Sequence, residues 1–296
     1  MHRLKYFTNI TPIVLFIIAS GCSKDGTKSN DTPKNISSDI NTIAVIYQEI
    51  NDSGITWAGN YTKDNIDTCN DRFEVDSAEP KSKIHLPIQQ DCSFGRDITN
   101  KDSDGRAGFS YQKINNQGIP LPDNSSSGNC VLDTVTGLLW EVKTEIDGIY
   151  GNSGLHDGDD LFTWYSNNSS VNGGAVGSWN NVLNICSGYI PNEPKTFCNT
   201  EEFIQRVNNV GLCGFKDWRL PTRFEIESLV DYGTKGPSID TTYFPNTKLE
   251  FYWSSTPAVN APFSAWAVNF RSSNTSLVSR ESSFPVRLVR DWVSKQ

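Results

Sequence analysis

The chain has one methionine, few histidines and no basic cluster. Three histidines occur in 296 residues, and the formal net charge is −8. A face that binds nucleic acid needs clustered lysine and arginine, so we expect no nucleic-acid partner. The motifs G-x-S-x-G and H-E-x-x-H, which mark serine hydrolases and zinc peptidases, are also absent. The composition and the missing motifs therefore disfavour a nucleic-acid-binding protein, a serine hydrolase and a zinc peptidase.

Aromatic residues are the positive feature of the composition. Hydrophobic residues make up 36% of the sequence, and aromatic residues alone make up 11%, with 8 tryptophans. We therefore expect a core rich in aromatic rather than aliphatic side chains. The length suits one large domain or two small ones.

The first 21 residues predict a secretory signal. Basic side chains near the start are followed by an apolar run over residues 10–19. This run is shorter than the ~20 residues that span a bilayer, and it has the length of a signal-peptide core. It ends in Ala19-Ser20-Gly21-Cys22, which resembles the lipobox of bacterial lipoproteins. We expect lipid on Cys22; an ordinary signal peptide with a chance cysteine is the alternative.

The segment after the signal predicts a flexible tether over residues 22–42. It is polar and has few apolar side chains, so it cannot bury enough surface to fold. Ser23, where inner-membrane lipoproteins carry Asp, resembles lipoproteins that are sorted to the outer membrane. The expected location is the cell envelope, with the chain anchored by lipid to the outer membrane and exposed at the surface.

The other six cysteines predict disulfides, because an exported chain meets an oxidising compartment. No C-x-x-C pair is present, which disfavours a metal site. The candidates are Cys69, Cys92, Cys130, Cys186, Cys198 and Cys213. Spacing does not determine their connectivity, but Cys198 and Cys213 flank a predicted helix and are the favoured pair.

Two helices are predicted by capping residues and apolar periodicity. The first runs over residues 200–209, with Asn199 as its cap and Glu202 as the reciprocal cap. The second follows Pro221, with a capping box formed by Thr222 and Glu225. Their apolar faces comprise Phe203, Val207 and Val210 in the first helix, and Phe224, Ile226, Leu229 and Val230 in the second. We expect Gly211 and Gly233 to end them in a left-handed conformation.

Strands are predicted on both sides of the helices. A turn over residues 133–137 leads into a buried strand at 138–140, and strands are expected at 251–253, 265–270 and 286–289. Trp266, Val268 and Phe270 should share one face of their strand. Residues 147–181 lack periodicity, although their aromatics indicate packing. This order predicts an α+β fold with an antiparallel sheet. We expect residues 43–129 to pack on a main domain at 130–292.

Four sequence strings carry a family resemblance: Gly-Leu-Leu-Trp-Glu at 137–141, Gly-Phe-Lys-Asp-Trp-Arg-Leu-Pro-Thr at 214–222, Tyr-Trp-Ser-Ser-Thr at 252–256 and Val-Arg-Leu-Val-Arg at 286–290. Together they resemble the Lcl C-terminal domain family, over about residues 130–291. The family resembles the C-type-lectin fold, which implies two helices, twisted antiparallel sheets and loops that bind ligands. Trp218 and Trp253 would then be core anchors, and Asp217, Arg219, Arg287 and Arg290 would pair with opposite charges.

Two upstream strings, at 92–97 and 102–105, resemble family lipoproteins that are targets of diversity-generating retroelements. In such targets, a C-terminal stretch is mutated at template adenines, and residues 258–284 have a matching composition. The alternative is a plain Ser/Asn-rich sheet edge. The ligand-binding candidates are Asn260, Phe263, Ser264, Arg271, Ser272, Asn274, Ser279, Arg280 and Phe284, with a core position as the alternative for Phe284 in particular.

Two acidic segments raise the question of calcium. Asn100, Asp102 and Asp104, followed by Gly105, resemble the first half of a calcium loop. Position twelve would be Tyr111 rather than Glu, so this is no EF-hand. The cluster over residues 156–160 is the second segment. A solvated acidic loop is the other interpretation for both, and no other cofactor is expected.

The expected function is ligand binding without catalysis. The lectin-like fold also hosts formylglycine-generating enzymes, but those need reactive cysteines, and disulfides account for the six thiols here. We expect a surface lipoprotein whose diversified C-terminal face binds an extracellular protein or glycan, with the membrane as a second partner through the lipid. The alternatives are a glycan-binding adhesin of fixed specificity and a structural envelope lipoprotein.

Overall fold

The computed structural model describes residues 51–60, 64–66, 96, 103–180 and 182–292. The chain divides into two units, Met1–Val45 and Ile46–Gln296. The predicted signal, Cys22 and the predicted tether all precede residue 51 and so lie outside the described residues. The described part is α+β and mostly β, as the order of the sequence patterns predicts. Among these residues, none of the helices has the length and hydrophobicity of a transmembrane span.

A four-stranded antiparallel sheet joins the first and last parts of the main domain. Its strands are β3 (Tyr111–Ile114), β4 (Cys130–Asp133), β5 (Leu138–Glu141) and β11 (Val289–Asp291), in the order β11-β5-β4-β3. The predicted turn between β4 and β5 is confirmed. The Asp133 carboxylate accepts from the backbone N–H groups that follow it, at 3.0 and 3.1 Å, and Gly137 closes the turn with φ 69°.

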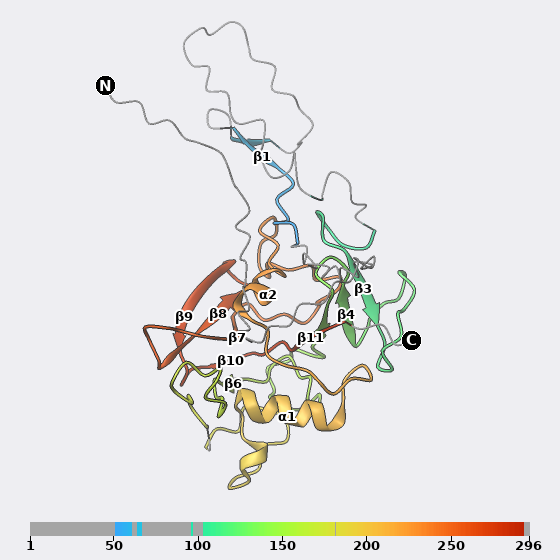
Figure 1. The fold of residues 1–296 in the computed structure, drawn as a ribbon. Coiled ribbons are helices and arrows are strands. Elements are labelled where there is room, and N and C mark those ends of the chain that lie inside the picture. Colours follow the sequence, from blue (N-terminus) through green and yellow to red (C-terminus); the bar gives the residue numbers. More distant parts are fainter. Residues whose placement is uncertain (1–50, 61–63, 67–95, 97–102, 181, 293–296) are drawn as a thin grey trace, which may run out of the picture. The chain divides into compact units, whose positions relative to one another are not determined.

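A three-stranded meander forms the second main sheet and lies on the opposite side of the domain in Figure 1. It consists of β7 (Phe251–Pro257), β8 (Ser264–Asn269) and β9 (Asn274–Ser279), with β9 at one edge. Smaller elements are the hairpin β1 (Ala58–Asn60) and β2 (Asp64–Ile66), the pair β6 (Phe162–Thr163) and β10 (Ser283–Phe284), and the 3-10 helix η3 (Pro194–Thr196). The strands expected at 251–253 and 265–270 are therefore present. The final strand, expected at 286–289, instead covers Val289–Asp291, so only its last expected residue lies in β11.

Helix α1 (Thr200–Val210) begins as predicted at Asn199, whose side chain accepts from the Glu202 N–H at 3.0 Å. The reciprocal bond is absent, because the Glu202 carboxylate accepts no hydrogen bond within the described residues. Phe203 and Val207 are buried, as expected. Val210 is 72% exposed, so its expected place on the apolar face is wrong; the helix ends there and its last turn projects past the core.

Helix α2 (Arg223–Glu227) has the predicted capping box between Thr222 and Glu225. Ile226 is buried, but Phe224 is 71% exposed, because the helix is a little over one turn long and this residue lies on its outer side. Gly233 does not end it with a left-handed residue. A Cβ there would instead lie 2.1 Å from the Gly54 carbonyl oxygen, so the close approach of two backbones requires glycine.

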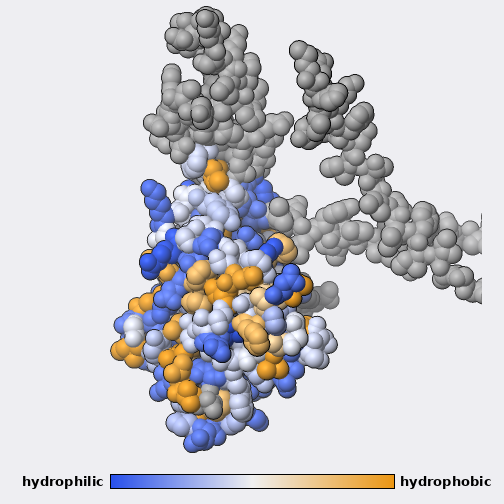
Figure 2. Space-filling model, turned by 90° about the vertical axis from the view of Figure 1, so that its left-hand side faces the viewer, coloured by the Kyte–Doolittle hydropathy of each residue, from blue (hydrophilic) through white to orange (hydrophobic). Residues whose placement is uncertain are grey.

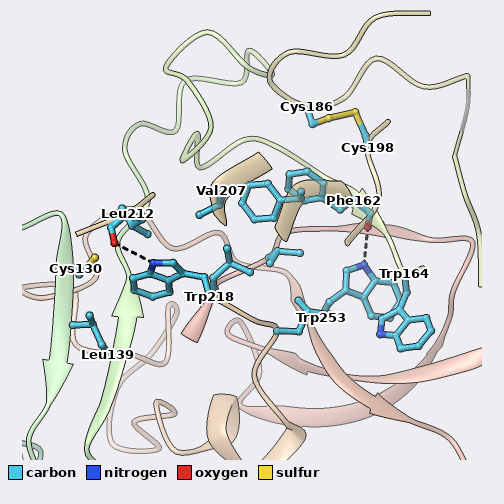
Figure 3. Close-up of a cluster of buried hydrophobic side chains, with 14 of the residues drawn as sticks. Cys130, Leu139, Phe162, Trp164, Cys186, Cys198, Val207, Leu212, Trp218 and Trp253 are labelled. Carbon is cyan, nitrogen blue, oxygen red and sulfur yellow. Dashed lines mark hydrogen bonds between the residues drawn. A yellow bond between two sulfur atoms is a disulfide. The ribbon is translucent and has the colours of Figure 1, made fainter. Parts of the chain in front are cut away.

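The aromatic core is confirmed, and it consists of two clusters. Trp218 and Trp253 are buried in the first cluster, where their indole N–H groups donate to the carbonyls of Leu212 (3.1 Å) and Phe162 (2.7 Å) (Figure 3). The second cluster surrounds Trp140 and includes Ile226 of α2 together with Leu229 and Val230, which follow the helix. Trp218 and Trp253 are accommodated because each buried N–H has a main-chain acceptor, whereas the buried N–H of Trp140 has no hydrogen-bond partner within the described residues.

Disulfides form, but not with the favoured pairing. Cys130 bonds to Cys213 and Cys186 bonds to Cys198, whereas Cys69 and Cys92 lie outside the described residues. The expected Cys198–Cys213 pair is wrong. Cys213 lies in the turn after α1 that packs against the start of β4, while the chain before η3 folds back on itself to bring Cys186 to the start of the same helix.

Candidate ligand-binding surface

The nine predicted contact residues do not form one site. One group lies at the end of the meander where β8 begins: Asn260, Phe263, Ser264, Ser279 and Arg280. A second group lies at the β8–β9 turn: Arg271, Ser272 and Asn274. A six-residue strand separates them, which at about 3.3 Å per residue is roughly 16 Å. Phe284 lies apart from both groups, on β10.

The first group lies at the most exposed apolar residues of the chain's C-terminal part, one of which, Phe263, belongs to it. Phe263 is 79% exposed and Val259, in the same β7–β8 loop, is 94% exposed. Asn260 and Ser279 are exposed beside them, while Ser264 is half-buried. This end of the sheet can therefore offer both apolar area and polar groups to a partner.

Arg280 is a correction to the predicted site, because it is 1% exposed. Its Nε donates to the Ser264 carbonyl at 3.0 Å and its Nη2 to the Asn172 carbonyl at 2.9 Å. Its Nη1 donates to the carbonyl of Ala175, and the guanidinium lies over the Trp164 ring at 3.9 Å. Arg280 therefore joins the loop over residues 172–177 to the meander instead of facing solvent.

Phe284 is not an exposed contact residue either; the alternative, a position in the core, describes it better. It is half-buried, and its ring packs against those of Phe251 (5.5 Å between centroids) and Trp253 (5.3 Å). Its position on β10, which pairs with β6, turns it toward the core.

The second group is exposed, but its polar atoms are partly used within the turn. The Nε of Arg271 donates to the Leu249 carbonyl at 3.0 Å. The hydroxyl of Ser272 donates to the side-chain oxygen of Asn274. These bonds hold the turn in one shape and leave fewer groups free for a ligand.

The structure adds a partly exposed aromatic surface that the sequence did not single out: Phe224 is exposed, and Arg223 and Trp266 beside it are half-buried. The Arg223 guanidinium lies between the rings of Phe224 (4.4 Å) and Trp266 (4.6 Å). Leu277, 44% exposed, is paired with Trp266 across β8 and β9. Figure 2 looks onto the side that carries β9 in Figure 1, and hydrophobic residues gather there among hydrophilic ones. One sequence feature could have indicated this surface: Arg223 and Phe224 directly follow the cap residue Thr222, at the start of a helix too short to bury both side chains.

The charged residues of the four family strings mostly form ion pairs within the domain. Arg290 binds Asp217 at 2.7 Å, and this hydrogen bond holds the pKa of Asp217 below its usual value. Arg219 binds Glu225 at 2.8 Å and Asp291 at 3.2 Å. The prediction of opposite-charge partners is therefore confirmed for these residues.

Arg287 differs from Arg219 and Arg290 because its direct partners are uncharged. It is fully buried, and it donates to the Glu141 main-chain carbonyl at 2.7 Å and to the Thr247 hydroxyl at 2.9 Å. Its guanidinium lies 5.0 Å from the centre of the Phe244 ring. The expectation of a paired carboxylate is therefore not met at this position.

The acidic segments do not assemble a metal site in the described part of the chain. Asn100 and Asp102 lie outside the described residues, and the Asp104 carboxylate accepts from the Ser110 hydroxyl at 2.5 Å. Among described residues, no group of three or more metal-ligating side chains is present. Calcium at residues 100–104 stays an untested prediction.

The second acidic cluster is buried rather than solvated. Asp157, Asp159 and Asp160 are at most 2% exposed. Asp159 binds Lys248 at 3.0 Å, and the His156 Nδ1 lies 2.8 Å from the carboxylate of Glu141. Because these carboxylates are buried, the interpretation as a solvated loop is wrong. Backbone N–H groups also donate to all three aspartates, although the Oδ1 of Asp160 has no hydrogen-bond partner within the described residues.

The family of the main domain is shown by comparison with known proteins. Residues 129–290 match the model of the Lcl C-terminal domain family. No curated protein and no solved structure match the chain. The matched region runs from the start of β4 into β11 and includes both helices and the whole meander. Because it covers more than half of the sequence, the chain belongs to the Lcl C-terminal domain family.

Proposed function

We propose that this chain is a surface-displayed bacterial lipoprotein that binds a ligand through the C-terminal face of a C-type-lectin-like domain, and that a retroelement diversifies this face. The C-terminal face means the exposed side chains of residues 258–284 together with Arg223 and Phe224. Membership of the Lcl C-terminal domain family indicates a surface or extracellular protein in general terms. The finer statements rest on the features below.

One observation carries the binding proposal, namely the stacked surface of Arg223, Phe224, Trp266 and Leu277. Isolated exposed apolar residues are common, but here the exposed Phe224 and Leu277 are connected through the half-buried Arg223 and Trp266, and a connected group of this kind favours a partner. Aromatic rings and arginine are also the side chains that contribute most at interfaces. Their rigid stacking lowers the entropy lost on binding.

The meander beneath this face favours tolerance of sequence change. The opposite face of β8 is packed, since Ala265 and Ala267 are fully buried in the first core cluster. No residue of the edge strand β9 is fully buried, and Asn274, Leu277 and Ser279 are exposed. Substitutions at the exposed positions would leave the core contacts intact, which suits a diversified surface.

The anchor proposal rests on the sequence alone, because Cys22 lies outside the described residues. Metabolic labelling with a fatty-acid probe tests it. Cys22→Ser should abolish label, whereas Ser20→Ala, which keeps a small residue before the cysteine, should retain it. Label on the Cys22→Ser protein would reject lipidation at this position. Protease shaving of intact cells then reports whether the domain faces outward.

Binding is proposed rather than catalysis. Cys130, Cys186, Cys198 and Cys213 are all in disulfides, so none of these four offers the reactive thiol that a formylglycine-generating enzyme needs. Their oxidised state also fits an exported protein. An oxidase activity on cysteine-containing peptides would contradict the proposal.

Diversification is tested at the level of DNA. A repeat nearly identical to the coding sequence of residues 258–284, differing at adenines and lying near a reverse-transcriptase gene, is the expected result. If both are absent from the flanking DNA, the specificity of the face is fixed.

The binding role is tested by screening the full-length protein against glycan arrays and surface proteins. Phe224→Ala and Leu277→Ser should each remove most binding to any ligand found. Val210→Ala is the matched control, because Val210 is equally exposed on α1, outside the proposed face. Equal loss in the control would contradict the C-terminal face as the site. No ligand in any screen would favour a structural envelope role.

A further inference from the structure

The outer edge of β9 is suited to pairing with another strand. β9 is the last strand of the meander, and no described segment pairs with its second side (Figure 1). Proteins usually protect such an edge with charged residues, proline or a bulge, because its free main-chain groups invite a further strand. β9 has none of these protections: its six residues are uncharged and contain no proline, and its register with β8 is continuous.

The hydrogen-bond pattern of the sheet shows which main-chain groups of β9 point outward. In an antiparallel ladder, hydrogen-bonded residue pairs alternate with non-bonded pairs. The Arg280 N–H donates to the Phe263 carbonyl at 2.9 Å, which sets the phase of the alternation between β8 and β9. The even-numbered residues of β9 therefore bond to β8. The main chain points outward at the odd-numbered residues, which are Thr275, Leu277 and Ser279.

These outward main-chain groups are available to a partner. Within the described part of the chain, the N–H and C=O groups of Thr275 and Leu277 and the N–H of Ser279 have no main-chain partner on this side. The Ser279 carbonyl accepts from the Ser282 N–H at 3.0 Å, and its second lone pair can accept another donor. A neighbouring strand would therefore meet three donors and three acceptors.

A second copy of β9 matches this edge in antiparallel orientation. When Leu277 of one copy lies opposite Leu277 of the other, Thr275 lies opposite Ser279, and every outward N–H meets an outward C=O. The two exposed leucine side chains then lie side by side, next to the Trp266 that each is paired with on β8. This arrangement has two-fold symmetry, which is the commonest symmetry of homo-oligomers.

Charge at the ends of β9 favours a second copy over an unrelated strand. Arg271, in the turn before β9, and Glu281, in the turn after it, are both exposed. Only the Nε of Arg271 donates within the described residues, to the Leu249 carbonyl, so its two terminal nitrogens are available. Antiparallel pairing brings the first turn of each copy beside the second turn of the other, so opposite charges meet twice. Parallel pairing would place like charges together.

We propose that two copies of this chain associate through their β9 edges, antiparallel and with Leu277 opposite Leu277. The two meanders then form one continuous six-stranded sheet, and two C-terminal faces lie side by side across the symmetry axis. The pairing uses main-chain groups and does not depend on the ligand binding or the diversification proposed above. One strand pair is a small interface, so the copies exchange, and the test captures the dimer covalently.

The test uses the full-length chain in detergent, with micelles in excess over chains so that two copies rarely share a micelle. Leu277→Cys should give a disulfide-linked dimer on mild oxidation. Residues of a hydrogen-bonded pair have Cα atoms about 5.5 Å apart, which a disulfide can bridge. Val210→Cys is the matched control, because Val210 is also exposed but lies on α1. The control and the parent protein should give little or no dimer.

Two further variants test the register. Thr275→Cys and Ser279→Cys should link to each other when the two proteins are mixed. Neither should link to itself, because the two like residues are then four positions, or about 13 Å, apart along the strands. Parallel pairing in register would give the reverse pattern.

Charge and main-chain variants test the forces that hold the dimer. In the Leu277→Cys protein, Arg271→Glu should lower the yield of linked dimer, and adding Glu281→Arg should restore it. Thr275→Pro removes an outward N–H and leaves the bonds to β8 in place. It deletes two symmetric hydrogen bonds and should weaken association about tenfold in analytical ultracentrifugation.

Three results would overturn the proposal. They are a dimer yield from Leu277→Cys no higher than that of the control, self-linking of Thr275→Cys, and no rescue by the second charge change. An unrelated strand, or another part of this chain, at the edge would give the first result. Near-UV circular dichroism verifies that each variant is folded. No measurement involves a ligand, so failure here leaves the proposed ligand binding untouched.

Discussion

Individual buried side chains decide how the loops of this domain are held. The Arg280 guanidinium donates to three main-chain carbonyls and stacks on Trp164, although no carboxylate bonds to it. A buried charge with this many hydrogen bonds is tolerated, but removing it leaves several carbonyls without donors. Its function is to fix the loop over residues 172–177 against the start of β8.

Arg280→Met should lower the free energy of unfolding by about 2 kcal/mol or more, because buried carbonyl acceptors lose charged donors. Urea denaturation measures the change. Arg271→Met is the control, since Arg271 is exposed in the same stretch and its loss should change stability by less than about 0.5 kcal/mol. Similar changes in stability for the two variants would show that Arg280 does not hold the loop over residues 172–177 against β8.

The pH dependence of stability is a second prediction at the residue scale. Burial, opposed by a hydrogen bond from the Ser187 N–H, raises the pKa of Asp160 to about 6. In the unfolded chain its pKa is near 3.8. The folded state therefore binds a proton more tightly, and the contribution of Asp160 to stability falls as pH rises from about 4 to about 6. Asp133 and Asp231, whose pKa values burial also raises, act in the same direction.

Asp160→Asn should reduce this loss of stability between pH 4 and pH 6, as followed by thermal unfolding at a series of pH values. Asn cannot ionise, so the variant lacks the unfavourable buried charge above pH 6. A pH slope equal to that of the parent protein would show that Asp160 does not titrate in this range.

At the scale of elements, the two disulfides constrain loops of very different length. Cys130 and Cys213 are 83 residues apart and connect β4 to the turn after α1. Cys186 and Cys198 are 12 residues apart and close the loop around η3. All four cysteines are buried to a similar degree, so the comparison between the two bonds is matched.

Replacing both cysteines of a bond by alanine should cost more for the Cys130–Cys213 bond than for the Cys186–Cys198 bond. Loop-closure entropy predicts a difference of about 2 kcal/mol. Urea unfolding without reductant measures it. An equal or reversed order would indicate that structure left in the unfolded chain, rather than loop length, sets the contribution.

At the scale of the whole molecule, the last strand closes the domain. β11 pairs with β5, and Val289 also exchanges hydrogen bonds with Arg219, so one short strand contacts two distant parts of the chain. Leu288 and Val289 are fully buried in the two core clusters. The N-terminal side is held in a similar way, since the Asn51 amide donates to the Asp133 carboxylate at 2.5 Å.

A chain that ends at residue 285 should fail to fold, because it loses β11 and buried apolar residues from both clusters. A chain that ends at Trp292 keeps all of these and should fold normally. Limited proteolysis and near-UV circular dichroism distinguish the two. A protease-resistant product from the shorter chain would show that β11 is dispensable.

The sequence by itself determined the helix caps and turns, because these are stabilised by hydrogen bonds between residues close together in the chain. The Asn199 cap, the Thr222–Glu225 capping box and the turn that ends at Gly137 all depend on bonds between residues a few positions apart. The family strings likewise predicted that Trp218 and Trp253 are core anchors. Periodicity failed for Phe224 and Val210 because a short helix and a last turn need not follow the core.

The tertiary structure alone decided which distant residues meet. Cysteine pairing depends on where α1 places Cys213. The predicted contact residues are divided because the two larger groups lie at opposite ends of β8. Arg280 looked like a contact residue by type, yet three carbonyls from two segments surround it. Residue type reports what a side chain can do. Burial and partners, which arise from long-range packing, decide whether it faces a ligand or holds the fold.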